Sequence, residues 1–136
     1  MKRAAADDEP VYLELADALE LYAAIIGGTV SEAGDQLRNR SGLESALARP
    51  RSYAHYEDAD LALQGAMLAH GIAEGQTFID GNKRLALVAL LTFLEVNGER
   101  VEASDPELAD WILSLSADTT AAQLADLIRE RLRPIC

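Results

Sequence analysis

The amino-acid sequence predicts an all-α protein: a single compact domain of about six helices, with at most one small β-hairpin flap. Hydrophobic residues make up 49% of the 136 residues and aromatic residues only 5%, so the core must be built from Leu, Ala, Ile and Val. Apolar side chains recur at helical spacing in several segments. The strand candidate, residues 100–103, is too short to found a sheet.

A chain of this length is typical of one domain with one core. Residues 1–10 predict a flexible lead-in, and residues 11–136 the domain. The first helix is predicted over residues 11–26, because apolar residues at 12, 15, 19, 22 and 26 form one stripe and Gly27-Gly28 stops it. Residues 29–42 predict a loop or short helix. Residues 43–48 predict a short helix that Arg49-Pro50 ends, and residues 51–58 an irregular segment.

The second half of the chain alternates helices with clear stop signals. Residues 58–70 predict a helix with many small side chains, which allow close approach of a neighbour, and Gly71 or Gly75 ends it. A helix over residues 82–96 should follow, and then a turn at Asn97-Gly98. Ser104 and Thr120 are the expected N-caps of two last helices, which should run to about residues 115 and 132.

The charge balance restricts the partners. Twelve Lys and Arg against 23 Asp and Glu give a net charge of −11, which would repel DNA or RNA and favours a basic partner segment. Cys136 is the single cysteine, so an internal disulfide is impossible and a cytoplasmic location is expected. No apolar run approaches the ~20 residues of a membrane span, and the N-terminus has no apolar core of a signal peptide.

Residues 76–84, Gln-Thr-Phe-Ile-Asp-Gly-Asn-Lys-Arg, are the most informative segment. Lys83 and Arg84 fall in the first turn of the following helix, where the helix dipole favours anions by about 0.3–1 kcal/mol per charge. A bound polyanion would remove this conflict, because backbone N–H groups, dipole and cations would then face the same charge. The segment therefore predicts a site for the phosphates of a nucleotide.

The other residues of this segment have two interpretations each. Asp80 could bind a Mg²⁺ that bridges two phosphates, or it could cap the helix. Gly81 permits positive φ, which aims the following N–H groups at one anion, or it is a simple turn glycine. Asn82 could donate to a phosphate oxygen or cap. Phe78 is expected to anchor the loop to the core, and the two cations could be merely solvated.

These residues resemble the motif of the Fic/Doc family, His-x-Phe-x-(Asp/Glu)-Gly-Asn-Gly-Arg, in the version of its Doc (death-on-curing) branch, which ends in Asn-Lys-Arg. Leu87 stands where Fic enzymes that transfer AMP have a further arginine, which also fits Doc. The resemblance covers roughly residues 11–132. It includes residues 41–50, 68–71, 93–98 and 103–105.

The resemblance implies a six-helix domain that binds ATP and Mg²⁺. Doc is the toxin of a toxin–antitoxin pair; it phosphorylates a threonine of elongation factor Tu, and the C-terminal segment of its antitoxin folds onto it. By this resemblance Asp80 would hold Mg²⁺, residues 44–53 would form the flap that receives the target, and the nucleotide would be bound by Phe78, Gly81, Asn82, Lys83 and Arg84.

Gln76 departs from the family at the catalytic position. The family histidine acts as general base, and a glutamine amide has no useful basicity, although it can still hydrogen-bond a hydroxyl. Losing a general base typically costs about 10²–10⁴-fold in rate. Nucleotide binding should survive, since the anion site does not need the base.

Three explanations of Gln76 remain open at this stage. The position was changed so that a toxic protein could be made; the chain is a natural pseudoenzyme; or another group, such as His55 or His70, supplies the base, or a loose transition state needs none. The intact remainder of the motif favours the first explanation, because a drifting pseudoenzyme would more often have lost several residues.

The leading functional hypothesis is a Doc-type protein kinase toxin in a base-deficient form. One alternative is a Fic-type transferase that moves AMP instead of phosphate; Lys83 and the missing second arginine count against it. The other is a catalytically silent module that binds antitoxin or nucleotide.

Overall fold

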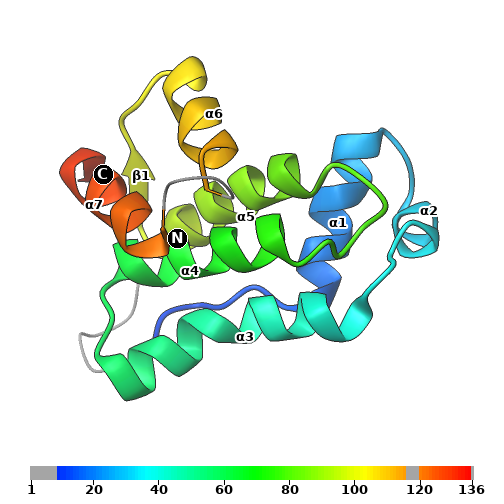
Figure 1. Ribbon diagram of the computed structural model, residues 1–136, viewed down its shortest axis with the longest axis horizontal. Helices are drawn as coiled ribbons and strands as arrows, with labels where there is room; N and C mark the ends of the chain where they lie inside the picture. Colours follow the sequence, from blue (N-terminus) through cyan, green and yellow to red (C-terminus); the bar gives the residue numbers. More distant parts are fainter. Residues whose placement is uncertain (1–8, 116–119, 136) are drawn as a thin grey trace.

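The computed structural model describes residues 9–115 and 120–135 (Figure 1). The helices are α1 (Leu15–Ile26), α2 (Val30–Asp35), α3 (Arg40–Glu57), α4 (Leu61–Glu74), α5 (Asn82–Val96), α6 (Asp105–Leu113) and α7 (Ala121–Arg131). The all-α prediction is confirmed. Most of the predicted lead-in, residues 1–8, lies outside the described residues. Within the described ranges, no helix combines the length and apolarity that crossing a membrane requires.

Helix α4 is the centre of the fold. It packs against α3, α5 and α7, while α5 also packs against α1 and α6. The small residues predicted on α4 allow this packing: a Cβ added to Gly65 would lie 2.7 Å from Cδ1 of Leu90 on α5. In Figure 1 the connection between α4 and α5 lies on the right, beside α1 and α2, and α7 lies on the left.

Several helix ends match the prediction. Helix α5 spans residues 82–96 as predicted, and Gly98 after it has φ 85°. Ser104 and Thr120 are the N-caps of α6 and α7; each side chain accepts a hydrogen bond from the N–H of the third residue of its helix, in a capping box. Gly75, one of the two predicted stops, is the C-cap of α4.

Helix α1 begins later than predicted. Residues 11–14 are not helical, and the helix starts at Leu15. The Val11 N–H donates to Oδ1 of Asn97 at 2.8 Å, and Nδ2 of Asn97 donates to the Val11 carbonyl at 2.9 Å. Because this pair holds Val11 against the end of α5, the helix starts only after Glu14, whose N–H donates to the Asp17 carboxylate.

Residues 43–48 are helical as predicted, but the predicted helix end at Arg49-Pro50 and the irregular segment after it were wrong. Helix α3 is continuous from Arg40 to Glu57 and contains Pro50 in its interior, so residues 51–57 are helical rather than irregular. Proline removes one N–H from the helical ladder, but Pro50 is buried with Leu43, Ala46 and Leu47 on the side of α3 that packs against the core. The packing of this side of α3, to which Leu43, Ala46 and Leu47 contribute, keeps the helix continuous despite the lost hydrogen bond, and the helix ends only at Asp58, which adopts φ 53°.

The small sheet joins two distant parts of the chain. Strand β1 (Glu99–Val101) pairs antiparallel with β2 (Leu132–Pro134), so the predicted strand segment finds a partner directly after α7. The pair lies near α7, away from the motif segment (Figure 1), and is therefore no flap over that segment.

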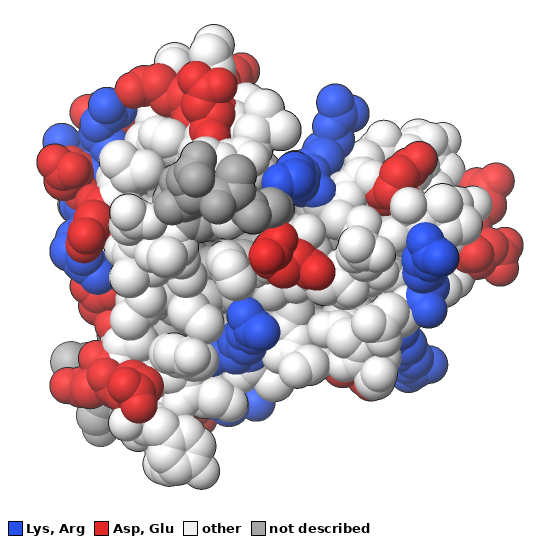
Figure 2. Space-filling view, in the orientation of Figure 1, with Lys and Arg blue, Asp and Glu red and all other residues white. Residues whose placement is uncertain are grey.

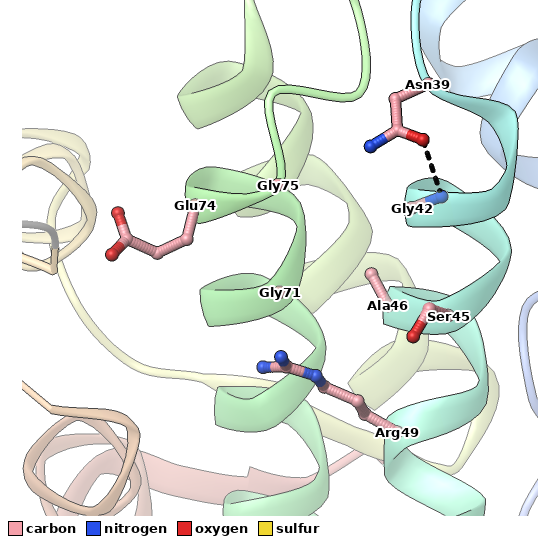
Figure 3. Close-up of a pocket in the computed structure, with 8 residues that line it drawn as sticks. All are labelled: Asn39, Gly42, Ser45, Ala46, Arg49, Gly71, Glu74 and Gly75. Carbon is pink, nitrogen blue, oxygen red and sulfur yellow. Dashed lines mark hydrogen bonds between the residues drawn. The ribbon is translucent and has the colours of Figure 1, made fainter.

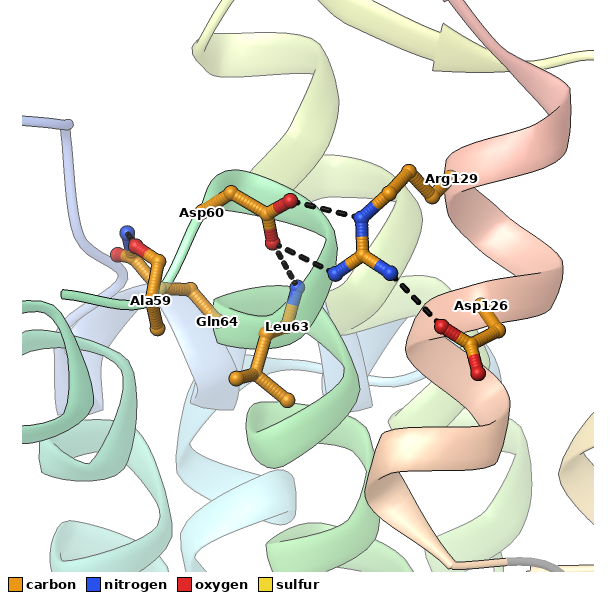
Figure 4. A network of polar contacts seen from close by, with 6 residues as sticks. All are labelled: Ala59, Asp60, Leu63, Gln64, Asp126 and Arg129. Atoms are coloured by element: carbon orange, nitrogen blue, oxygen red, sulfur yellow. Dashed lines mark hydrogen bonds and ion pairs between the residues drawn. The ribbon is translucent and has the colours of Figure 1, made fainter. Parts of the chain in front are cut away.

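Helices α4 and α7 are also connected by an ion-pair network (Figure 4). Asp60, the N-cap of α4, accepts two hydrogen bonds from the Arg129 guanidinium, at 2.8 and 3.0 Å, and a third from the Leu63 N–H at 3.0 Å. Arg129 also contacts Asp126 at 2.8 Å. Arg129 thus does more than complement the dipole of α7, because it connects that helix to the start of α4.

Candidate nucleotide-binding site

The predicted site residues lie in the connection between α4 and α5, here called the motif loop (residues 76–81), and in the first turn of α5. Gln76 follows the C-cap of α4, is exposed, and has φ 47°. This left-handed conformation is uncommon for a residue with a side chain and costs about 1 kcal/mol. The backbone therefore turns sharply away from α4 at the position where the family has its histidine.

Asn82 holds the motif loop in its folded shape. Its Oδ1 accepts hydrogen bonds from the Thr77 hydroxyl at 3.0 Å and from the Phe78 N–H at 2.9 Å, and its Nδ2 donates to the Phe78 carbonyl at 3.0 Å. Thr77 is fully buried, so these bonds also satisfy a polar group that water cannot reach. A phosphate could use only the second N–H of this amide.

Phe78 anchors the motif loop, as predicted, and its partner is Tyr22 of α1. The two rings stack with centroids 3.8 Å apart and an interplanar angle of 11°, and both residues are buried. The Tyr22 hydroxyl donates to the Asp80 carbonyl at 3.0 Å. Burial, and secondarily the nearby Asp80 charge, raise the pKa of Tyr22, so the phenol stays protonated and remains a donor.

Tyr22 is the functional residue that sequence reasoning missed. The apolar stripe of the first helix included position 22 only as core. The available signal was its hydroxyl, because a buried tyrosine normally needs a hydrogen-bond partner, but the partner is a backbone carbonyl 58 positions away in the sequence. Gly81 fits against the same ring: an added Cβ would lie 3.5 Å from Cε1 of Tyr22.

A second segment supports the motif loop from the other side. Leu37 forms an isolated antiparallel bridge with Phe78. The N–H groups of Arg38 and Asn39 donate to the Thr77 carbonyl at 2.8 and 3.1 Å. Residues 44–53, predicted as a flap, are helical in α3 instead, and residues 36–39 are the segment that pairs with the motif loop.

The first turn of α5 has the features of an anion site. Its N-cap is Gly81 with φ 77°, which provides no side-chain cap, whereas the N-cap side chains of α2, α3, α4, α6 and α7 each accept a hydrogen bond. Lys83 is half-buried and Arg84 exposed in this turn. Helix N–H groups not bonded by a cap, together with two cations, favour a phosphate.

Asp80 provides one exposed carboxylate directly before this turn. The described residues contain no group of three or more His, Cys, Asp or Glu side chains that could hold a metal alone. Mg²⁺ keeps several waters and is often bound by one or two carboxylates together with substrate phosphates. The residues present therefore fit a Mg²⁺ that arrives with a nucleotide better than a permanently bound metal.

The arginines of the described residues divide into two sets. Ion pairs occupy Arg40, Arg51, Arg100, Arg129, Arg131 and Arg133. Arg38, Arg49 and Arg84 form no ion pair with any described residue, and all three belong to segments beside the motif loop. Figure 2 shows acidic side chains gathered along the upper, left and right edges of this face, with cations both at these edges and nearer its middle. The locally uncompensated positive charge favours anionic ligands.

The structure places His55 far from the motif loop along α3. His55 lies in the last turn of α3, about 20 Å along the helix from the end that adjoins the loop, at about 1.5 Å per residue. Its ring contacts Tyr56 edge-on at 4.7 Å. His70 lies within α4, and its Nδ1 is buried without a hydrogen-bond partner in the described structure. The position of His55 therefore does not support the role of a substitute base.

Comparison with known proteins agrees with this geometry. A model of the Fic/DOC family matches residues 12–94, from before α1 to near the end of α5. The Toxin Doc of Mycolicibacterium smegmatis is 32% identical over 123 residues, which are 84% of this chain and 91% of that protein. The Protein kinase doc of Escherichia phage P1 is 35% identical over 88 residues, 63% of this chain and 69% of that protein. The chain therefore belongs to the Fic/Doc family.

Proposed function

We propose that the chain is a Doc-type toxin whose site transfers the γ-phosphate of ATP to a Thr or Ser hydroxyl of a protein, and that Gln76 leaves this form weak or inactive. The observation that carries the proposal is the first turn of α5, with a glycine N-cap, two cations and an adjacent free carboxylate. One relative is named a toxin and another a protein kinase, which supports the same reading.

Each residue has a defined part in the proposed transfer. The N–H groups at the start of α5, with Lys83 and Arg84, would hold the phosphates of ATP, and Asp80 would hold a Mg²⁺, which would neutralise part of their charge. Asn82 and Phe78 keep the motif loop in the shape that presents these groups. Preorganised donors of this kind require no rearrangement when charge develops in the transition state.

The transfer forms one P–O bond and breaks another. The acceptor hydroxyl oxygen attacks the γ-phosphorus, the bond to the bridging oxygen breaks, and ADP leaves with the electron pair. In a loose transition state the hydroxyl proton is lost late, so the amide of Gln76 could orient the hydroxyl without removing its proton. A histidine at this position would accept the proton and raise the rate by about 10²–10⁴-fold.

The partners follow from the same assignment. We propose elongation factor Tu or a similar translation factor as the substrate, and a cognate antitoxin whose C-terminal segment docks on the chain. The net charge of −11 suits an antitoxin segment with basic residues. A Fic-type transfer of AMP is less well supported, because Leu87, at the position of the second arginine, packs against the core.

A growth experiment tests the proposal. The chain and its Gln76→His variant are expressed from a tightly controlled promoter in bacteria that lack an antitoxin. The variant should arrest growth, and the unchanged chain should do so weakly or not at all. The double variant Gln76→His, Asp80→Asn is the matched control and should not arrest growth. If Gln76→His accumulates in folded form and growth continues, a silent binding module replaces the kinase.

A further inference from the structure

The side chain of Arg49 occupies an unusual place for a cation. It extends from α3 across the surface of α4 at Gly71, and its guanidinium makes no hydrogen bond or ion pair with a described residue (Figure 3). Arg51, two positions along the same helix, is by contrast paired with Glu9 and stacks 4.7 Å from the Tyr12 ring centroid. Arg49 is also half-buried rather than fully solvated.

Gly71 holds Arg49 in this place. A Cβ on Gly71 would lie 2.9 Å from the Cβ of Ala46 and 3.4 Å from the Cδ of Arg49, so the missing side chain lets α3 approach α4 and lets the arginine stem lie on the glycine. The close approach of the two helices at this glycine therefore makes room for the arginine stem.

A groove of about 220 Å³ runs from Arg49 toward the motif loop between α3 and α4. Gly75, directly before Gln76, lines one end, and Asn39, whose N–H supports the Thr77 carbonyl, lines the same end. Small side chains, among them Ser45 and Ala46, leave the groove open. One end of the groove therefore adjoins the start of the motif loop.

We infer that this groove receives the acceptor segment of the protein substrate, with an acidic side chain of that segment bound by Arg49. This rests on the proposed function and specifies the substrate that the site selects. An extended segment is the occupant we infer, because the groove is lined by Arg49 and also by Gly75, the residue before Gln76. A carboxylate is the side chain that fits, because Arg49 offers a guanidinium without a counter-charge, and such pairs are directional and strong.

The geometry also sets the spacing between the carboxylate and the hydroxyl. From Gly71 to Gln76 the chain advances about 7 Å along α4, at about 1.5 Å per residue. An extended peptide advances about 3.3 Å per residue. The acidic residue should therefore stand about two or three positions from the accepting threonine or serine, and an acid much farther away should not reach Arg49.

Glu74 also lines the groove but does not neutralise Arg49. No ion pair joins them, and Figure 3 shows the Glu74 carboxylate pointing away from α3. Glu74 would nevertheless repel an acidic segment that passes it. Removal of this charge should therefore increase the affinity for an acidic peptide without changing the preferred spacing.

Peptide binding tests the inference independently of phosphate transfer. The probes are fluorescein-labelled peptides with one central threonine in an alanine–glycine background, in which a single aspartate is moved stepwise away from the threonine; a second set has lysine instead. Affinities are measured by fluorescence anisotropy with the full chain. Aspartate about two or three positions from threonine should bind about fivefold more tightly than the same peptide without it.

Charge reversal gives the decisive comparison. Arg49→Glu should lose the preference for aspartate and gain one for lysine at the same spacing, while Arg51→Glu, the matched charge change on the same helix, should keep the aspartate preference. Glu74→Gln should strengthen the preference for aspartate. The gain for lysine shows that Arg49→Glu is folded. The inference would be overturned if all peptides bound with equal affinity or if no peptide bound. It would also be overturned if Arg51→Glu alone lost the preference for aspartate.

The peptide-binding result and the phosphate-transfer result can fail independently of each other. If phosphate transfer fails but the aspartate preference follows residue 49, the groove binds an acidic segment and the kinase assignment is wrong. If phosphate transfer occurs in Gln76→His and the preference is absent, the kinase assignment stands and the groove has no part in selecting the substrate.

Discussion

Tyr22 and Asn82 hold the motif loop by different means, and each contributes what the other lacks. Asn82 satisfies the polar groups of Thr77 and Phe78 from within the segment, whereas Tyr22 reaches the loop from α1 through a ring stack and one hydroxyl bond to Asp80. The Tyr22 hydroxyl is the direct link between α1 and the backbone of the residue proposed to hold Mg²⁺.

Replacement of Tyr22 by phenylalanine separates the hydroxyl from the ring. Tyr22→Phe keeps the stack on Phe78 and loses the bond to the Asp80 carbonyl, so the free energy of unfolding should fall by about 1 kcal/mol. Because Asp80 is then less well positioned, the affinity for Mg²⁺–ADP in calorimetry should fall about three- to tenfold.

Tyr12→Phe is the matched control, because the Tyr12 hydroxyl donates to Oε1 of Gln64 at 3.0 Å, far from the motif loop in sequence. It should have a similar effect on stability and none on nucleotide affinity. Equal losses of affinity in both variants would show that Tyr22 acts only through general stability.

Gln76 is informative through its backbone as well as its side chain. Among residues with a side chain, Asn, Asp and His adopt the left-handed region several times more readily than others. The φ of 47° at position 76 therefore suits the family histidine at least as well as it suits glutamine. Gln76→His should fold without rearrangement of the motif loop, and its melting temperature should stay within a few degrees of the parent.

At the scale of elements, the sequence predicted those helices whose ends carry local signals. Helix α5 was predicted from Gly81 and Asn97-Gly98, and α6 and α7 from their N-caps. The long helix α3 was not predicted, because Pro50 is a local stop signal. Long-range packing against α4 overrides this signal. The pairing of residues 36–39 with the motif loop was missed for a similar reason, since the two segments are far apart in the sequence.

Pro50 gives a prediction about α3. Pro50→Ala restores an N–H that can donate to the Ala46 carbonyl and adds a good helix former, so it should stabilise the protein by about 1–2 kcal/mol in urea unfolding. The lost packing of the buried ring opposes this gain. A net loss of stability would mean that the ring, and not only its neighbours Leu43 and Leu47, holds α3 against the core.

At the scale of the whole molecule, acid should unfold the protein through two carboxylates that connect its helices. The hydrogen bond from Arg129 lowers the pKa of Asp60, and that from Arg131 lowers the pKa of Glu107 to about 2 from an ordinary value of 4.5. A lowered pKa contributes stability above the unfolded value, and that contribution disappears as pH falls through the folded value.

The melting temperature should therefore fall between about pH 4.5 and pH 2. Variants Asp60→Asn and Glu107→Gln should start less stable and show a shallower decline over this range. Thermal unfolding followed by circular dichroism at a series of pH values measures both. An equally steep decline in the variants would assign acid unfolding to the many other carboxylates of this acidic chain.

The local charge beside the motif loop differs in sign from the net charge of the whole molecule. The net charge of −11 describes the surface that an antitoxin would meet, while the arginines that make no ion pair within residues 9–115 and 120–135, Arg38, Arg49 and Arg84, belong to segments beside the motif loop. This contrast could not be predicted from the sequence, because it depends on which arginines find a carboxylate after folding. It is the arrangement expected if the molecule binds anions at one place only.

The transfer of labelled phosphate tests the central claim most directly. The chain and its Gln76→His variant are each incubated with Mg²⁺ and γ-labelled ATP in the presence of elongation factor Tu, and a parallel series uses α-labelled ATP. We predict that the variant transfers label from γ-labelled ATP alone and that the parent transfers about 10²–10⁴-fold less. Transfer of α-label by the variant, or no transfer from either nucleotide while the variant still binds Mg²⁺–ADP, would contradict the phosphotransferase assignment.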